Sequence, residues 1–537
     1  MFFLMFNLFL STPRFRKFGL DFKKRNQLIS HLLKSDIHLK IFALLTIISF
    51  SIMGRISLKI PILKDAVIAL LSLTKMHTLI SYSVVNRFTN QIETEDPGTI
   101  ISFDEIIVGS GVGGSIAAME AMVKGRRTLI VEMGSKIDPQ IPHQSLGQLA
   151  THFLYGGQEI AFGNRLITYA QGSALGGGSE INSGLYHKLP KKIRHTWLKK
   201  LNINSKEWDK SEKHIEELLR IEQQNQVSLG CYRNSPFIFI AKANGWDHML
   251  VPRWRRYANK KFVHFGMTRA VLKDEQQKGL YILKNHRVLK FAVNKENIKV
   301  TIKFNGGTKV LNSKYLTLAG GTTETPRLLV RSGFAKPKDL FFNFHAMTRL
   351  VAVFGRKVND LKDIDPHQTW NRDHSVKFGA AVGTIEFLEA TLSNFKVSEK
   401  ISHENALVAY VSTEPKGVGR FIKIGSIFIP CFKFTKTSLR EISSNTKLLK
   451  SSLHEAGAIK IFGSDSSPKI SSVHIFGSLP LGKTKLLDKN GFLKHTSNKV
   501  RVCDGSLLPS APLVNPQGPL AVLSLVLSRR VNDRYWK

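Results

Sequence analysis

The chain has 537 residues, of which 42% are apolar and 22% are charged. One hydrophobic core rarely serves such a length, so we expect at least two domains. The composition excludes a wholly disordered chain, a collagen-like repeat and a multi-span membrane bundle. Lys and Arg total 78 against 40 Asp and Glu, a net charge of +38 that favours an anionic polymer or membrane as partner.

The positive charge is spread along the chain. The first 100 residues hold 13 Lys or Arg and 6 Asp or Glu, a net of +7, so the remaining residues carry +31. Two denser clusters lie around 191–200 and 253–261. No zinc finger, basic zipper or RNP-type motif is present, so we expect no nucleic-acid partner. The three cysteines are far apart, which predicts no disulfide framework, no metal site and a reducing compartment.

Residues 1–99 form an N-terminal extension that is apolar and basic, and we expect it to be helical. Its apolar runs, at 1–10, 41–53 and 66–73, are shorter than the about 20 residues of a bilayer span. Basic residues follow the first run, which argues against a signal peptide. The runs are expected to pack on the main domain. The alternative is an interfacial helix in peripheral contact with an anionic membrane, on a protein that is otherwise cytoplasmic.

The first strong motif is a βαβ unit. A predicted buried strand, 103–108, runs into a G-x-G-x-x-G turn, a helix over about 114–124 and a second strand, 128–132. The glycines allow a tight turn, a close backbone approach to a pyrophosphate and close packing of helix on strand. Glu132, at the end of the second strand, can accept hydrogen bonds from ribose hydroxyls. The candidate cofactor-binding residues here are Gly109, Gly111, Gly113, Gly114 and Glu132.

A second glycine-rich segment, 172–184, is too rich in glycine for regular structure, and its free N–H groups can line a flavin or its phosphates. It resembles the flavin loop of the glucose–methanol–choline (GMC) oxidoreductases, which reads roughly G-x-x-L-G-G-S-S-x-I-N. Gly178 replaces the first Ser of that pair, as in the cholesterol oxidase-like branch. The matching residues are Gly172, Leu175, Gly176, Gly177, Ser179, Ile181 and Asn182.

Two further segments strengthen the resemblance, which covers the chain from about residue 103 onward and implies FAD as the cofactor. Residues 318–333 resemble the second GMC signature, with a turn at Gly321 and a helix expected to begin near Pro326. Residues 502–509 resemble V-D-A-S-x-x-P, which places Asp504 beside the flavin ribityl and pyrophosphate. Val288, in the strand-rich segment 280–318, completes the candidate cofactor-binding residues.

The resemblance also implies the catalytic residues. Oxidising an alcohol needs a group that takes the hydroxyl proton, and a neutral imidazole does so near pH 7. GMC enzymes carry this His in H-P-x-G-T-x-x-M-G, which corresponds here to His474, with Ile475 in place of Pro and Leu481 in place of Met. The family's second active-site residue corresponds to Asn515, and Pro516 follows it in the flavin site. A His/Asn pair resembles the choline and cholesterol oxidase branches.

Other polar residues have a plainer interpretation. His187, His345 and His367 have no motif support, so we expect them on the surface or in packing. Without the surrounding motifs, His474 would also be interpreted as a hydrogen-bonded core histidine. Asn182 either reaches the flavin, as the resemblance implies, or only holds its own loop.

The predicted fold class is α/β, with an FAD-binding Rossmann-like (GMC-type) domain and a second substrate domain of antiparallel sheet plus helices. Asn-Gly-Gly at 305–307 predicts a hairpin within the flavin domain. The proposed boundaries are 100–190, 270–335 and 465–537 for the discontinuous flavin domain, and 191–269 and 336–464 for the substrate domain.

The leading functional hypothesis is an FAD-dependent oxidoreductase that oxidises a CH–OH group by hydride transfer to flavin N5, with His474 as the base. O2 or an unknown carrier takes the electrons. Residues 184–190 resemble the flavin loop of bacterial family members that act on sugars or surface polysaccharide, which implies such a substrate, whereas the apolar N-terminal runs favour a hydrophobic alcohol. The basic clusters steer an acidic substrate or hold the enzyme on an anionic surface. The alternative is a flavin-binding, non-catalytic component of a glycan-assembly or membrane-associated complex.

Overall fold

The computed structural model describes residues 102–536, apart from 139–140, 142, 144, 158, 222–233, 259–260, 305–306, 360–363, 382–383 and 426. Two compact units make up the chain, Met1–Asn90 and Gln91–Lys537, and the described residues belong to the second. The predictions for residues 1–99 therefore lie outside the described residues. Among the residues that the structure does describe, no helix combines the length and apolar character needed to cross a bilayer.

The first sheet contains the predicted βαβ unit. Its strand order is β8-β2-β1-β11-β10-β9, with β22 beside β11. The pairs among β8, β2, β1, β11 and β22 are parallel, whereas β9, β10 and β11 form an antiparallel meander. The strands are β1 (Ser102–Val108), β2 (Thr128–Val131), β8 (Tyr281–Leu283), β9 (Arg287–Val293), β10 (Ile298–Phe304), β11 (Gly307–Leu318) and β22 (Val500–Val502).

Several sequence predictions are confirmed in this sheet. The strand expected at 103–108 is β1, and the helix expected after the glycine turn is α6 (Val112–Val123). β10 and β11 pair antiparallel with Phe304 opposite Gly307, so the chain reverses at the predicted hairpin. One boundary was wrong. The helix expected near Pro326 is α12 (Gly321–Arg331), which begins five residues earlier because the Asp504 carboxylate accepts the Gly321 N–H.

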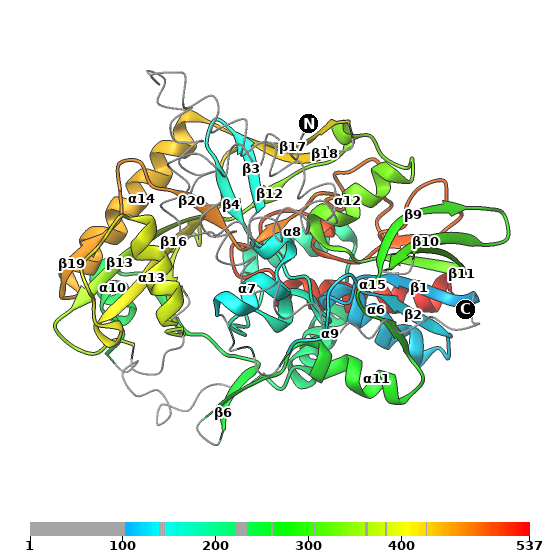
Figure 1. Cartoon of the computed structure of the whole chain (residues 1–537), viewed down its shortest axis with the longest axis horizontal. Helices are drawn as coiled ribbons and strands as arrows, with labels where there is room; N and C mark the ends of the chain where they lie inside the picture. Colours follow the sequence, from blue (N-terminus) through cyan, green and yellow to red (C-terminus); the bar gives the residue numbers. More distant parts are fainter. Residues whose placement is uncertain are drawn as a thin grey trace, which may run out of the picture. The chain divides into compact units, whose positions relative to one another are not determined.

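The second sheet has eleven strands in the order β17-β18-β3-β4-β20-β13-β16-β15-β14-β5, with β19 beside β13. Most pairs are antiparallel, and Figure 1 shows β13, β16 and β19 on the opposite side of the described chain from β1 and β2. The strands are β3 (Glu159–Gly163), β4 (Ile167–Tyr169), β5 (Asp247–Leu250), β13 (Ala346–Phe354), β14 (His367–Trp370), β15 (Val376–Ala380), β16 (Ala406–Thr413), β17 (Gly417–Ile424), β18 (Ile427–Phe434), β19 (Ala458–Phe462) and β20 (Ile470–Ser472).

The predicted α/β fold class is confirmed: the first sheet with its helices is Rossmann-like, and the second sheet is largely antiparallel. The proposed domain boundaries stay a prediction, and β3, β4 and β20 hydrogen-bond into the second sheet although they fall in ranges proposed for the flavin domain. Two two-stranded pairs complete the strands: β6 (Arg255–Ala258) with β7 (Lys261–His264), and β12 (Asn343–Phe344) with β21 (Ile475–Phe476).

Helices cover both sheets. α15 packs against α6 and α9, whereas α14 and α13 pack against β13 and β16. Buried leucines of α14 share a core with Leu350 and Ala409, and those of α13 share another with Val351 and Val408. Because side chains alternate along a strand, α13 and α14 cover opposite faces. The remaining helices are α7 (Leu146–His152), α8 (Lys191–Leu201), α9 (Ser205–Leu218), α10 (Pro236–Asn244), α11 (Lys273–Gln277), α13 (Ile385–Asn394), α14 (Lys436–Glu455) and α15 (Gln517–Arg534).

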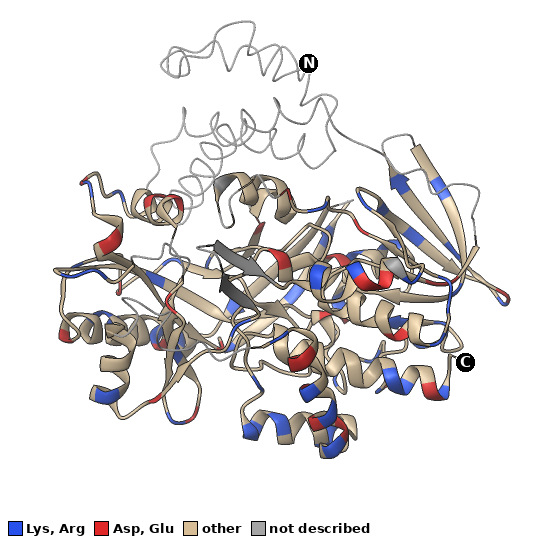
Figure 2. Cartoon of the chain, turned by 90° about the horizontal axis from the view of Figure 1, so that it is seen from below, with Lys and Arg blue, Asp and Glu red and all other residues tan. Residues whose placement is uncertain are grey.

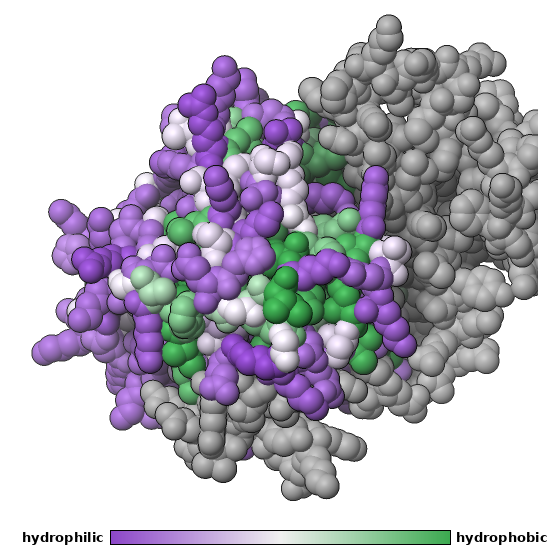
Figure 3. Space-filling model, turned by 90° about the vertical axis from the view of Figure 1, so that its left-hand side faces the viewer, coloured by the Kyte–Doolittle hydropathy of each residue, from purple (hydrophilic) through white to green (hydrophobic). Residues whose placement is uncertain are grey.

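The surface repeats the even charge distribution of the sequence. Lys and Arg lie on helices and strands throughout the described chain, with Asp and Glu among them (Figure 2). The first basic cluster is α8, most of whose basic side chains are exposed, but Arg253 of the second cluster is buried and donates to the Ser183 carbonyl. Apolar residues gather in the middle of the face shown in Figure 3, within a hydrophilic rim.

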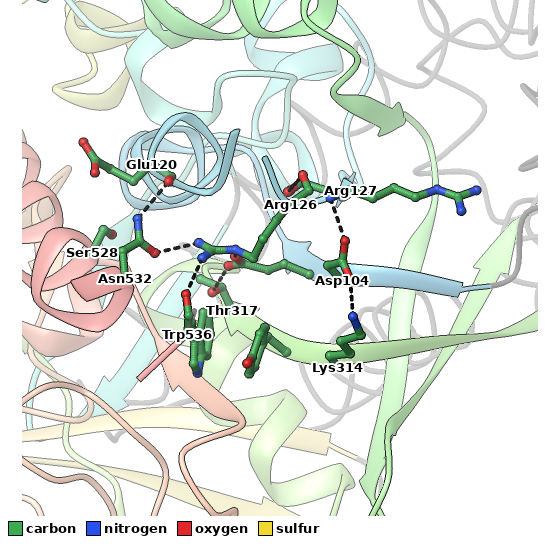
Figure 4. Close-up of polar contacts among 12 residues, drawn as sticks. Asp104, Glu120, Arg126, Arg127, Lys314, Thr317, Ser528, Asn532 and Trp536 are labelled. Carbon is green, nitrogen blue, oxygen red and sulfur yellow. Dashed lines mark hydrogen bonds and ion pairs between the residues drawn. The ribbon is translucent and has the colours of Figure 1, made fainter. Parts of the chain in front are cut away.

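A buried polar network ties the C-terminus to the first sheet (Figure 4). The Glu105 carboxylate, fully buried in β1, accepts from Arg126 Nε at 3.0 Å and from Thr317 Oγ1 at 2.6 Å. Arg126 also donates to the Trp536 carbonyl and to Asn532 Oδ1, at 3.0 and 2.6 Å. A buried carboxylate is tolerated only with such partners, so the network fixes α15 against β1.

We expect the substitution Arg126→Met to lower the free energy of unfolding by about 3 kcal/mol, because it removes the closer of the two ion pairs of the buried Glu105 carboxylate and leaves only Arg501, at 3.7 Å. The midpoint of urea unfolding measures the effect. The control is Arg127→Met, which removes an exposed guanidinium from the next position and should change stability by less than about 1 kcal/mol. Equal effects of the two substitutions would contradict the assigned role of the network.

Candidate active site

The turn between β1 and α6 is in close contact with two segments that are distant in sequence. A Cβ atom added at Gly113 would lie 1.8 Å from the Cys503 carbonyl oxygen. One added at Gly109, where φ is +94°, would lie 2.4 Å from the Ala319 carbonyl oxygen. Both distances are far below van der Waals contact, so only glycine fits. The turn is thereby held against the ends of β11 and β22.

Gly111 differs from these glycines. A Cβ there would meet no atom within 4 Å, although the Gly177 backbone lies against the other side of the residue. Gly111 is the N-cap of α6, and no side chain caps the helix. Free N–H groups at a helix start, next to space that one added carbon would fill, fit a pyrophosphate. The structure thus leaves open the position at which the motif predicts a dinucleotide.

Glu132 links the two glycine-rich segments. Its Oε2 accepts from the N–H and the hydroxyl of Ser110, at 2.9 and 2.6 Å, and its Oε1 accepts from Gly134 N at 2.7 Å. The Ser110 hydroxyl accepts in turn from Gly176 N at 2.9 Å. Burial raises the pKa of Glu132, and these donors lower it. The Met133 N–H is a further donor to this carboxylate, so Glu132 is held firmly between the two glycine-rich segments.

Asp504 connects the other two motifs. Its carboxylate accepts from Gly321 N at 2.8 Å, Thr325 Oγ1 at 2.5 Å and Ser506 N at 2.8 Å. Gly321 lies at the start of α12, and Cys503, next to Asp504, carries the carbonyl that packs on Gly113. The segments expected to bind one cofactor are therefore joined by direct contacts.

The other predicted cofactor residues occupy varied places. Both polar ends of Asn182 bond within the protein: Oδ1 accepts from Gly184 N at 2.9 Å, and Nδ2 donates to Gln517 Oε1. Ser179 Oγ donates to the Gly176 carbonyl at 2.7 Å. Pro516 is the N-cap of α15. Gly114 packs on the Gly109 carbonyl, Gly172 on the backbone of Gly177 and Gly178, and Val288 lies buried in β9.

His474 lies immediately before β21, next to a second histidine. Its backbone carbonyl accepts from His345 N at 3.0 Å, and the two rings stand edge to face with centroids 5.5 Å apart. The two Nδ1 atoms are 3.5 Å apart. The side chain of His474 is half-buried, whereas His345 is only 2% exposed. His345 therefore lies at the candidate site, although it has no sequence motif.

Asn515 contacts a buried lysine. Lys377 Nζ, from β15, donates to Asn515 Oδ1 at 2.8 Å. Because that bond occupies the carbonyl oxygen, the amide Nδ2 is directed away from Lys377, free to donate. Lys377 is 2% exposed and lies 5.6 Å from the centroid of the Tyr410 ring. The lysine thus sets the orientation of the amide.

His474 and Lys377 belong to one site, because the charged groups around them influence one another's pKa values. Burial lowers the pKa of His474 well below its usual value, and electrostatic interactions with His345, Lys377, His187 and Arg349 lower it further. Burial and Lys377 lower the pKa of His345 and of His187 to about 3. The three imidazoles are therefore neutral at pH 7. Burial also lowers the pKa of Lys377 to about 7.

Sequence reasoning missed Lys377, His345, His187 and Arg349. Of the three histidines without motif support, none is on the surface: His345, His187 and His367 are 2, 3 and 5% exposed. His187 Nε2 bonds to Gln368 Oε1 at 2.9 Å. The alternation Val-Lys-Phe-Gly-Ala places Lys377 opposite the apolar side chains and therefore predicts a solvent-facing lysine, so no signal of its burial is present in the sequence.

Comparison with known proteins adds to this geometry. The family description "GMC oxidoreductase" matches twice, its N-terminal part over residues 103–349 and its C-terminal part over residues 439–524. The chain belongs to the GMC oxidoreductase family. Its members are generally FAD-binding and act on CH–OH donors. The two matches contain the glycine turn and His474, respectively.

Individual GMC relatives are distant. The chain is 24% identical to an uncharacterized GMC-type oxidoreductase of Sinorhizobium fredii, over 78% of this chain and 93% of that protein. A long-chain-alcohol oxidase of Arabidopsis thaliana is 31% identical, but only over 22% of this chain and 16% of that protein. The crystal structure of pyridoxine 4-oxidase from Mesorbium loti superposes with a TM-score of 0.60 at 16% identity, over 80% of this chain and 99% of that one, and shows the shared fold.

The glycine contacts predict unequal effects of substitutions at Gly111 and Gly113. Gly113→Ala forces a Cβ into the Cys503 carbonyl, so we expect little folded protein and a lowered melting temperature. Gly111→Ala meets no protein atom and has an ordinary φ of −60°, so it should fold with a melting temperature near that of the parent apoprotein. A folded, stable Gly113→Ala protein would refute the close contact.

Proposed function

We propose that this protein is an FAD-dependent oxidoreductase that oxidises the CH–OH group of an alcohol. The observation that supports it best is the arrangement of His474 and Asn515. A neutral, half-buried imidazole and an amide with a free donor interact with the same buried lysine. Family membership supports the reaction class, and the geometry supports the roles of the residues.

The roles follow from the chemistry of each side chain. The alcohol must lose its hydroxyl proton, and His474 can accept it because its lowered pKa keeps the imidazole neutral at pH 7, with a ring nitrogen available for the proton. The substrate oxygen gains negative charge as the proton leaves, and Asn515 Nδ2 donates a hydrogen bond to it. Lys377 holds the amide in that orientation, since its ammonium bonds to Oδ1. When bound, FAD supplies the two-electron acceptor for the hydride on the carbinol carbon.

The residues proposed to hold FAD are those at the glycine junction. The start of α6 at Gly111 offers N–H groups and space for the pyrophosphate. Glu132 would face the adenosine ribose, and Asp504 would hold the flavin-side phosphate and ribityl chain. The remaining members of the proposed site are Gly109, Gly113, Gly114, Gly172, Gly176, Gly177, Ser179, Asn182, Val288, Gly321 and Pro516.

Flavin retention tests the cofactor part of the proposal. Gly111→Ala places a methyl group in the space proposed for the pyrophosphate, so the variant should purify folded but without the yellow flavin spectrum. Gly355→Ala is the matched control, because its Cβ also meets no atom within 4 Å and it lies at the end of β13, outside the glycine junction. Full flavin content in Gly111→Ala would place the phosphates elsewhere.

Anaerobic bleaching of the flavin tests the reaction. A panel of sugars, long-chain alcohols and small alcohols is mixed with the holoenzyme, and at least one should reduce the flavin. His474→Ala should keep the flavin and slow its reduction by roughly 10²- to 10⁴-fold, because the proton acceptor is lost. His195→Ala, which removes an exposed imidazole on α8, should reduce at the parent rate.

Two results would decide against this assignment. Parent-like reduction by His474→Ala would remove His474 as the base. A flavin that no alcohol bleaches would favour the alternative function, a flavin-binding component without turnover in a larger complex. Exposing the reduced enzyme to air then separates an oxidase, which reoxidises quickly, from a dehydrogenase that needs another carrier.

A further inference from the structure

One face of the second sheet carries basic side chains beside the candidate catalytic residues. Arg349 in β13 pairs across strands with Tyr410 in β16, and Lys377 in β15 pairs with Ser412, two residues further along β16. Cross-strand partners point to the same face of a sheet, so Arg349, Tyr410 and Lys377 share one face. His345, which precedes β13, and His187, which bonds to Gln368 of β14, border it.

This basic face contains no described acid. Besides burial, the main influences on the pKa values of Lys377, Arg349, His345, His187 and His474 come from these five groups themselves, from Tyr410 and from hydrogen bonds with Gln368 and the Leu185 backbone. Within the described ranges, no carboxylate forms an ion pair with Lys377 or Arg349. Even the nearest hydrogen-bonding partner of Arg349 is neutral, the Ser471 hydroxyl at 2.5 Å.

The face also leaves buried donor capacity unused. The described residues give Lys377 Nζ a single hydrogen bond, although an ammonium carries three donors. Arg349 Nε and His345 Nε2 are buried and have no hydrogen-bond partner in the described chain. Removing a cation from water without a counter-charge costs several kcal/mol, and each unused buried donor adds to the cost. Buried cations with free donors fit a ligand that is itself an anion.

We propose that the basic face binds an anionic group of the substrate, so that the alcohol oxidised by this protein carries a carboxylate or a phosphate. The inference rests on the proposed function and specifies its substrate class. Lys377 bonds directly to Asn515, so an anion on Lys377 lies next to the amide that holds the reacting oxygen. The hydroxyl and the anionic group are therefore separated by few bonds, as in a small hydroxy acid or a phosphorylated polyol.

The affinity of the basic face for an anion should depend on pH, because it depends on the charge of Lys377. Its pKa of about 7 lies between that of Arg349, which burial lowers to about 10, and those of His345 and His187, at about 3. His474 is neutral, and burial raises the pKa of Tyr410, which stays a phenol. Among these groups only Lys377 changes charge between pH 6 and 8.5, and it loses its positive charge as the pH rises. Anion affinity falls in the same direction. Asp365, whose pKa burial raises to about 7, also titrates in this range, but its carboxylate accepts from Ser235 and from His367 N, outside the basic face.

Calorimetric titration of the holoenzyme with acetate and with inorganic phosphate tests the site without turnover. We expect saturable binding that is at least tenfold weaker in Lys377→Met, and acetate binding that weakens from pH 6 to pH 8.5 in the parent but not in the variant. Lys423→Met, which removes an exposed lysine from β17 of the same sheet, should bind like the parent. If acetate binds more tightly than inorganic phosphate, the preferred group is a carboxylate. If phosphate binds more tightly, the preferred group is a phosphate.

Loss of the fold is not expected in Lys377→Met, because an apolar chain of similar size replaces an unpaired buried charge. Its melting temperature checks this. Arg349→Met is the second variant and should also weaken anion binding. It separates a site shared by both cations from an effect of Lys377 on Asn515 alone, since Arg349 has no bond to Asn515.

Matched substrates separate this inference from the proposed function. Anaerobic bleaching compares glycolate with ethylene glycol, and glycerol 3-phosphate with glycerol, at equal concentrations. The charged member should reduce the flavin at least tenfold faster, and Lys377→Met should remove the difference. Equal bleaching within each pair, or anion binding unchanged in both variants, would overturn the inference and leave the oxidoreductase standing. Lysine-dependent anion binding with no bleaching by any alcohol would overturn the oxidoreductase and leave the anion site.

Discussion

The contact of Gly113 with the Cys503 carbonyl is the constraint on which the candidate site depends. The α6 N-terminus can approach β22 this closely only because position 113 has no side chain. That approach places Asp504 beside Gly321, and the carboxylate then holds the start of α12. Gly109 makes the equivalent contact with Ala319. Four sequence motifs thereby meet at one backbone junction, and Gly111 is left facing the open space between them.

The buried Glu105 network stabilises the same junction from the opposite side. It ties the C-terminal residues Asn532 and Trp536 to β1 and β2 through Arg126. α15 is thereby fixed at its far end, while its first turn carries Pro516 and lies next to Asn515. The two buried charge systems differ in one respect. Glu105 has its cationic partner within the fold, whereas Lys377 has none among the described residues, which distinguishes a structural charge from one available to a ligand.

Part of the candidate site could be predicted from the sequence, because each of the segments proposed to bind the cofactor is a short continuous motif. Glycine turns have their own composition, and the strand–turn–helix order around Gly111 indicates a phosphate site from one segment alone. The start of α12 was misplaced because its initiating partner, Asp504, lies far along the chain. His345 and Lys377 could not be assigned for a related reason. The sequence of a buried strand does not show which of its two faces will border the active site, because that depends on how the strands pair in the sheet.

The amino-acid sequence by itself determined the Rossmann-like order of elements, the glycine junction, the hairpin at β10 and β11 and the family to which the chain belongs. These depend on short-range chemistry, which each segment carries on its own. Only the tertiary structure decided that Lys377 bonds to Asn515, that the His345 ring lies edge to face with that of His474, and that no described carboxylate pairs with Lys377 or Arg349. Those relations join β15, β13 and the two C-terminal motifs, and the desolvation that sets the charge of Lys377 exists only once the surrounding sheet and helices exclude water.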